Sequence, residues 1–110
     1  MPYDAALADR IRKALGRQPG LTEREMFGGV GFMLRGNMAC GVSGKEMIVR
    51  VGPAAHEAAM KEPHVRPFDL SAGKPPKGWL LVRPAGLKTE AALKRWVERG
   101  VAFARSLPPK

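Results

Sequence analysis

The sequence predicts an α+β fold in which helices pack as one layer on an antiparallel sheet. Two observations carry this prediction. Residues 25–51 alternate apolar and polar or small side chains, and two turn pairs that begin with glycine, Gly36-Asn37 and Gly44-Lys45, divide them into three strands. Both ends of the chain show apolar residues at helical spacing instead.

The elements follow in order along the chain. Asp4 is suited to cap a first helix that runs to about Arg17, with Leu7, Ile11 and Leu15 on its apolar stripe. Residues 21–27 form a short extended entry to the three strands. Pro53 suits the first turn of a short helix over residues 54–61, which ends before Pro63.

The last third of the chain returns to the sheet and closes with a helix. Residues 68–70 are predicted as a short strand, residues 71–78 as an exposed loop, and residues 79–83 as the last strand. Thr89 caps a final helix from Glu90 to about Leu107, where Pro108 ends it. The predicted order is therefore α-β-β-β-α-β-β-α.

The two turn pairs also predict the register and the faces of the sheet. Leu34 then lies opposite Ala39 and Phe32 opposite Gly41, and successive side chains alternate between faces. One face is almost wholly apolar and is the predicted core: Met33, Met38, Cys40, Val42, Met47, Val49 and Val51. Because helices cover one face of a two-layer fold, we expect the other face to be open as an interface with a protein partner or a second copy, through Val30, Phe32, Leu34, Ile48 and Arg50.

Length and charge bound the class of protein. A chain of 110 residues forms one domain, residues 1–110, and no apolar run approaches the ~20 residues of a membrane helix. The start of the chain has no secretory signal, so we expect a cytoplasmic protein. The net charge of +9 favours anionic partners. The candidate contacts with nucleic acid or another anion are Arg10, Lys13, Arg17, Lys74 and Lys77.

The side chains that usually carry catalysis do not form a recognisable pattern. His56 and His64 lie eight residues apart, which is not the spacing of a metal pair on one helix face, and one cysteine, Cys40, supports neither zinc nor a disulfide. Cys40 falls on the predicted core face, so we expect a buried thiol. We therefore expect a protein that is not an enzyme and that holds no cofactor and no metal.

Several segments resemble the N-terminal domain of the TfoX/Sxy family of competence regulators. The matching segments are Met26-Phe27-Gly28-Gly29-Val30-Gly31-Phe32, Gly36-Asn37-Met38-Ala39, Ile48-Val49-Arg50-Val51, Phe68-Asp69, Ser71, Gly73-Lys74-Pro75, Lys77-Gly78-Trp79-Leu80 and the closing Leu93, Trp96-Val97, Gly100 and Ala104-Arg105-Ser106-Leu107-Pro108. The resemblance implies a bacterial, cytoplasmic protein with the same order of elements, similar to secretion chaperones.

The resemblance also implies a role, with one departure. Better-known members regulate genes for DNA uptake together with a transcription activator, and they carry a second, C-terminal helical domain. This sequence ends at Lys110 without that domain, so we expect a stand-alone N-terminal domain whose regulatory role does not transfer directly. The family supplies no catalytic residues.

Three functions follow as expectations. The first is a regulatory interaction module that works by protein–protein contact. The second is direct binding of nucleic acid by a basic protein. The third is binding of a small anionic ligand by residues 71–77 beside Trp79, together with Arg66.

Overall fold

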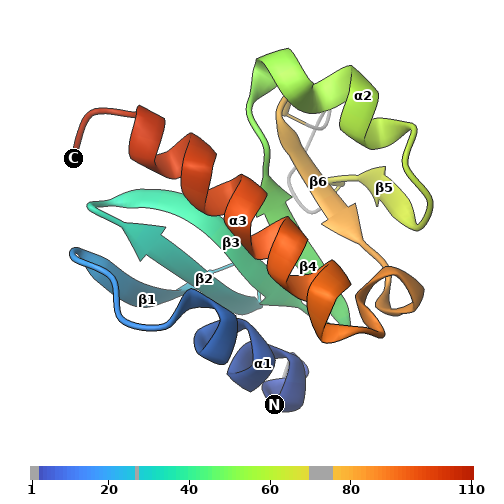
Figure 1. Cartoon of the computed structure of the whole chain (residues 1–110), viewed down its shortest axis with the longest axis horizontal. Helices are drawn as coiled ribbons and strands as arrows, with labels where there is room; N and C mark the ends of the chain where they lie inside the picture. Colours follow the sequence, from blue (N-terminus) through green and yellow to red (C-terminus); the bar gives the residue numbers. More distant parts are fainter. Residues whose placement is uncertain (1–2, 27, 70–75) are drawn as a thin grey trace.

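The computed structural model describes residues 3–26, 28–69 and 76–110. Within these residues one antiparallel sheet has the strand order β1-β2-β3-β4-β6-β5. Its strands are β1 Leu21–Met26, β2 Gly29–Leu34, β3 Asn37–Ser43, β4 Glu46–Arg50, β5 Val65–Pro67 and β6 Trp79–Val82. The helices are α1 Ala5–Leu15, α2 His56–Met60 and α3 Glu90–Ser106, with 3₁₀ turns at Pro53–Ala55 and Pro84–Leu87. Figure 1 shows α3 lying across the sheet, and the predicted fold class is confirmed.

Both long helices begin where the sequence predicts. The Asp4 carboxylate accepts a hydrogen bond from the backbone N–H of Leu7 at 3.1 Å, and the Thr89 hydroxyl accepts one from Ala92 at 3.0 Å. Each cap satisfies an N–H group that has no partner inside the helix. None of the helices in the described part of the chain is long and apolar enough to cross a membrane.

Two segments of the sheet differ from the prediction. Residues 21–27 were predicted as a short extended entry and not counted as a strand; residues 21–26 form β1, which pairs with β2 along its whole length, and Phe27 lies outside the described residues. The strand predicted at residues 68–70 lies earlier, at Val65–Pro67, while Phe68 follows it and Leu70 falls outside the described residues. Pro67 is tolerated because β5 is an edge strand, where no ladder bond is lost to the missing N–H.

The register of the second hairpin is confirmed, and that of the first is wrong. Val42 pairs with Met47 and Gly41 with Ile48, as the Gly44-Lys45 turn predicts. In the first hairpin, however, the turn residues are Arg35 and Gly36, with φ angles of 52° and 85°. Positive φ at both positions is typical of a type I′ turn.

Tertiary contacts hold Arg35 in this unusual conformation. Its N–H donates to the carbonyl of Gly20 at 2.9 Å, and its own carbonyl accepts from the N–H of Lys110 at 2.8 Å. A β-bulge between Phe32 and Met33 then changes the pairing, so that Phe32 lies opposite Cys40 and Met33 opposite Met38. Ala39 is the extra residue on β3, so Met38 and all the side chains of β2 lie on the sheet face opposite to the predicted one.

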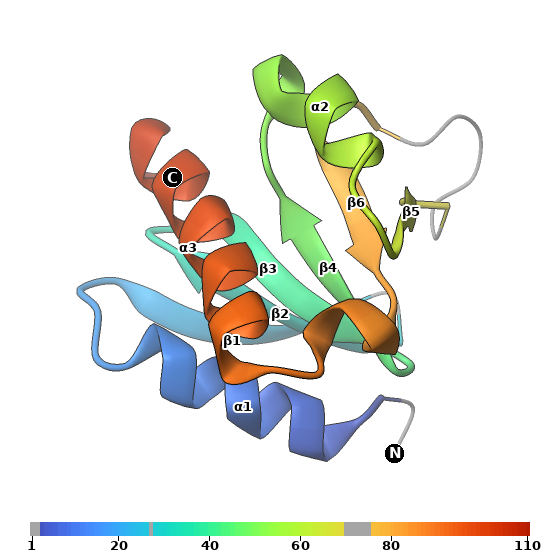
Figure 2. The same ribbon diagram turned by 45° about the vertical axis from the view of Figure 1, so that its right-hand side comes forward.

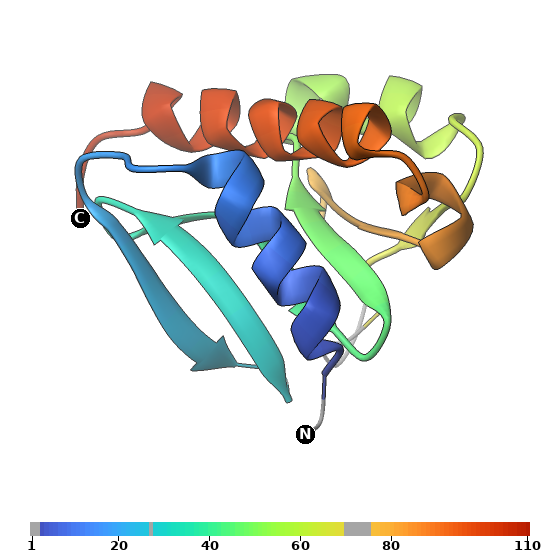
Figure 3. The ribbon, with the colours of Figure 1, turned by 60° about the horizontal axis from the view of Figure 1, so that its bottom comes forward.

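This exchange of faces corrects the predicted interface. Val30, Phe32 and Leu34 are not on an open face: they lie beneath the helices, with exposed fractions of 3%, 0% and 2%. Met33 and Met38, predicted in the main core, lie on the opposite side of the sheet. Figures 2 and 3 show the three helices on one side of the sheet, over the face that carries Phe32.

Cys40 lies in the helix-covered core, as predicted, and its side chain is fully buried. Burial raises the pKa of the thiol to about 12, because the apolar surroundings disfavour the thiolate. Only the thiolate is strongly nucleophilic, so this thiol is inert at neutral pH in the folded protein.

Candidate interaction surface

The sheet face that points away from the helices carries a second apolar cluster, which we call the outer cluster. Its buried members are Met33, Met38, Ile48, Phe68 and Leu81, and Met26 and Trp79 pack against them half-buried. Strands β1–β4 and β6 contribute all of them except Phe68, which follows β5. No helix in the described chain contributes to this cluster.

Two glycines form the floor of the outer cluster. Gly31 and Gly41 lie opposite each other on β2 and β3, and both lack a side chain on this face. Methionine side chains fill the space above them: the Met38 Cε lies 2.8 Å from where a Cβ of Gly41 would stand, and the Met26 Sδ lies 3.2 Å from that of Gly31. Methionine side chains are unbranched and adaptable, a property that variable binding surfaces use.

Charged side chains border the outer cluster. Arg24 lies opposite Gly31 on the edge strand and is exposed, with no carboxylate at ion-pair distance among the residues described. Arg66 holds Glu46 at 2.7 Å and Asp69 at 3.0 Å, so its charge is already compensated. The anionic-ligand site predicted around Arg66 therefore lacks a free guanidinium at that residue.

Arg50 has a different environment. Its guanidinium carbon lies 4.9 Å from the centre of the Trp79 ring and 5.2 Å from that of Phe103 on α3. Of the five residues predicted for the interface, Ile48 lies on the outer face and is fully buried there. Arg50 follows two residues later at the end of β4, where its guanidinium also reaches Phe103 of the helix layer. Phe68, Leu81 and Met33 were not predicted as members of this face. The sequence signal for the outer cluster is the frequency of methionine, and the alternation of side chains does not reveal the bulge that sets the faces.

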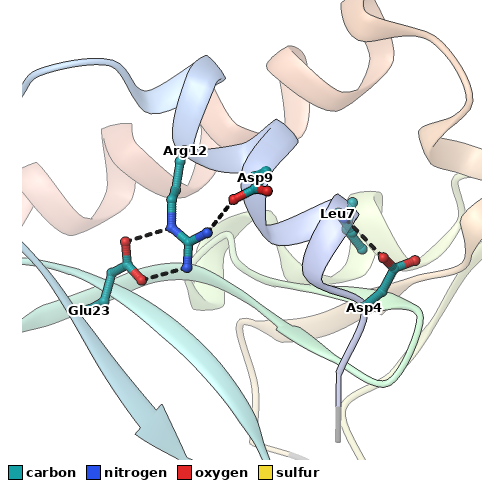
Figure 4. A network of polar contacts seen from close by, with 5 residues as sticks. All are labelled: Asp4, Leu7, Asp9, Arg12 and Glu23. Atoms are coloured by element: carbon teal, nitrogen blue, oxygen red, sulfur yellow. Dashed lines mark hydrogen bonds and ion pairs between the residues drawn. The ribbon is translucent and has the colours of Figure 1, made fainter. Parts of the chain in front are cut away.

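A polar network fixes the other edge of the sheet to the helix layer. Figure 4 shows Arg12 of α1 between Asp9 and Glu23, the latter on β1. Arg12 donates two hydrogen bonds of 2.8 Å to the Glu23 carboxylate and also lies over the Phe32 ring at 5.8 Å. These bonds hold the pKa of Glu23 below its ordinary value and raise that of Arg12.

Because the folded-state pKa of Glu23 is lowered, the ion pair stabilises the protein above about pH 4.5 and this stabilisation is lost as the pH falls below that value. Both side chains are 40% exposed, so solvent screening limits the effect to less than ~1 kcal/mol. We expect Glu23→Gln to lower the free energy of unfolding in urea at pH 7, and the difference from wild type to shrink at pH 3. Glu25→Gln on the same strand is the matched control, and an equal loss at both pH values for Glu23→Gln would contradict the assignment.

The predicted anion contacts do not converge on one site. Arg10 is engaged by Glu90 at 2.9 Å and by the carbonyl of Leu87 at 2.7 Å. Lys13, Arg17 and Lys77 are exposed and have no ion pair with any described residue. Lys74 lies outside the described residues. Arg10 also lines a small surface pocket with Asp4, Lys45 and Leu87, but its charge there is paired.

The histidines do not form a metal site with their neighbours. His56 accepts a hydrogen bond at Nδ1 from the N–H of Gly78 at 2.8 Å, so it ties the start of α2 to the segment before β6 rather than lying free on the surface. Over residues 3–26, 28–69 and 76–110, no group of three or more His, Cys, Asp or Glu side chains could hold a metal ion.

The fold and this surface define a two-layer α+β domain with an apolar cluster on the sheet face that no described helix covers. A family model described as the TfoX N-terminal domain matches residues 13–104, so the chain belongs to the TfoX N-terminal domain family. This finding confirms the resemblance drawn from the sequence. The comparisons with curated proteins and with solved structures found no match.

Proposed function

We propose that this protein is a non-enzymatic interaction module of the bacterial cytoplasm, which acts in gene regulation by contact with another protein. Membership of the TfoX N-terminal domain family supports a role similar to that of competence regulators. The transcription activator with which such regulators act is the partner that the resemblance favours.

The observation that carries this proposal is the outer cluster. Helices bury one face of the sheet, whereas the apolar residues of the other face are closed over by Phe68, Trp79 and their own methionine side chains. The buried members of the outer cluster are 0–9% exposed, so a partner would first contact the half-buried Met26 and Trp79 and would reach the others by displacing methionine side chains. An apolar cluster of this kind, bordered by charged residues such as Arg24, supports a role as an adaptable protein interface. The methionines over Gly31 and Gly41 can change rotamer to accommodate a partner side chain.

Charge reversal on the two layers tests this proposal. Arg24 and Arg95 are both exposed, and neither has an ion pair with a described residue, but Arg24 lies on the outer sheet face and Arg95 on α3. We expect Arg24→Glu to weaken the complex with the activator by about tenfold or more in calorimetric titration, because a rim charge then opposes the partner. Arg95→Glu should leave the affinity within about twofold.

Two outcomes contradict the proposal. One is that the purified protein and the activator form no complex at any concentration that sedimentation can examine. The other is that Arg95→Glu weakens the complex while Arg24→Glu does not, which would assign the contact to the helix layer.

A basic helix layer supports a second candidate, direct nucleic-acid binding. Lys13, Arg17 and Arg95 are exposed on or beside α1 and α3, and no described carboxylate neutralises them. Contacts with phosphates would make the affinity for duplex DNA fall steeply with salt. If this candidate is correct, Arg95→Glu weakens DNA binding and reduces that salt dependence, whereas Arg24→Glu affects both less.

A further inference from the structure

Five arginines of this protein are half-buried, and four of them hold a carboxylate. The half-buried group is Arg10, Arg12, Arg50, Arg66 and Arg99. Arg10 pairs with Glu90, Arg12 with Glu23, Arg66 with Glu46 and Arg99 with Glu62, at 2.7–2.9 Å. Arg50 has no carboxylate at ion-pair distance and donates no hydrogen bond to any residue that the structure describes.

The Arg50 guanidinium is only partly withdrawn from water and its N–H groups keep access to solvent, but even partial withdrawal is unfavourable when no counter-charge compensates it. Burial lowers the pKa of Arg50, which reports the same cost. The rings of Trp79 and Phe103, at 4.9 and 5.2 Å, compensate in part through cation–π contact. Ring contacts do not satisfy the N–H groups of a guanidinium, which point outward in its own plane.

Close backbone contacts at two glycines position the rings that lie beside Arg50. Gly52, with φ of 90°, has no side chain, and a Cβ there would stand 2.4 Å from the Phe103 ring. Gly78, with φ of 96°, packs against the backbone of Gly52, and the N–H groups of Val51 and Gly52 both donate to the Gly78 carbonyl. The two glycines thus bring Phe103 of α3 to the end of β4, beside Trp79 of β6. A site fixed by backbone contacts of this kind is pre-organised for a ligand.

We propose that Arg50, held between Trp79 and Phe103, is a receptor for a carboxylate group carried by an acidic side chain of the partner protein. The inference rests on the proposed function and specifies where the partner is recognised. Arg50 would donate two parallel N–H bonds to the incoming carboxylate, the geometry in which guanidinium and carboxylate pair most strongly.

Two features favour a carboxylate over a phosphate. Arg50 offers one positive charge, which a carboxylate matches and a phosphate dianion exceeds. The remaining half-buried arginines of this protein all satisfy their guanidinium groups with carboxylates, so the partner would complete at Arg50 the pairing that the chain makes for itself elsewhere.

The site can be tested on the protein alone, with acetate as the probe and inorganic phosphate as the comparison. Both are titrated against chloride at constant ionic strength, while NMR follows the Arg50 Nε–H and Trp79 indole signals. We expect acetate to shift both signals along a saturable curve and to bind at least threefold more tightly than phosphate. Arg50→Gln should abolish the Trp79 shift, and Phe103→Leu should weaken acetate binding about threefold while Arg50 remains. Arg83→Gln, at an exposed arginine that directly follows β6, should have no effect.

Each other outcome overturns the proposal. Preference for phosphate would assign the site to a phosphorylated ligand or nucleic acid. Shifts that grow linearly with both anions, or that persist in Arg50→Gln, would show ionic-strength or adventitious effects only. This titration needs no partner protein. If acetate does not bind, the carboxylate site is contradicted but the test of activator binding is unaffected. If the activator alone does not bind, the proposed function is contradicted but the carboxylate site is not.

Discussion

Replacing Phe32 by alanine should cost about 3–5 kcal/mol of unfolding free energy, the range typical of a fully buried phenylalanine. The Phe32 side chain has no exposed surface and lies in the core between the sheet and the helices, with Arg12 above its ring. Its removal leaves a cavity under α1 that the surrounding backbone cannot close. Urea unfolding followed by far-UV circular dichroism measures the loss as a lower transition midpoint.

The comparison residue for this prediction is Phe103, which is only half-buried. Phe103→Ala removes the same atoms, and we expect roughly half the loss or less, because less apolar surface returns to water. The experiment also decides between the predicted and the observed register. A Phe32→Ala variant as stable as wild type would place Phe32 on an open face and contradict the bulge.

Gly100→Ala should destabilise the protein by about 2 kcal/mol, although intrinsic helix propensity alone predicts a gain of about 1 kcal/mol. Gly100 lies in the middle of α3, and a Cβ there would stand 2.2 Å from the carbonyl oxygen of Ala39. The contact is with backbone of the central strand β3, so no side-chain rotation relieves it. Either α3 moves away from the sheet or the bulge deforms, and overpacking of this kind costs ~1–3 kcal/mol or more.

Ala102→Gly on the exposed side of α3 isolates the propensity contribution, and we expect it to cost about 1 kcal/mol. The sign of the Gly100→Ala effect is the informative result. If this variant unfolds at a higher urea concentration than wild type, α3 does not lie directly on Ala39, and the placement of the helix over the bulge is wrong.

The sequence alone determined the features that depend on local chemistry. Asp4 and Thr89 predicted both long helices, since a cap is formed within three residues of the chain. The Gly44-Lys45 turn predicted the register of β3 and β4, and the α+β fold class followed from the order of elements. The buried thiol of Cys40 was also predicted, although the same face assignment placed Met33 and Met38 wrongly.

The tertiary structure decided the features that depend on contacts between distant segments. Arg35 adopts positive φ because Gly20 and Lys110 hold its backbone, and Ala39 bulges where Gly100 brings α3 against it. The alternation of apolar and polar residues in the sequence contains no information on either contact. The one extra residue, Ala39, is enough to move Val30, Phe32 and Leu34 beneath the helices. The same reason applies to Arg50: its rings come from β6 and α3, more than twenty-five residues away in sequence, and only folding places them on either side of one guanidinium.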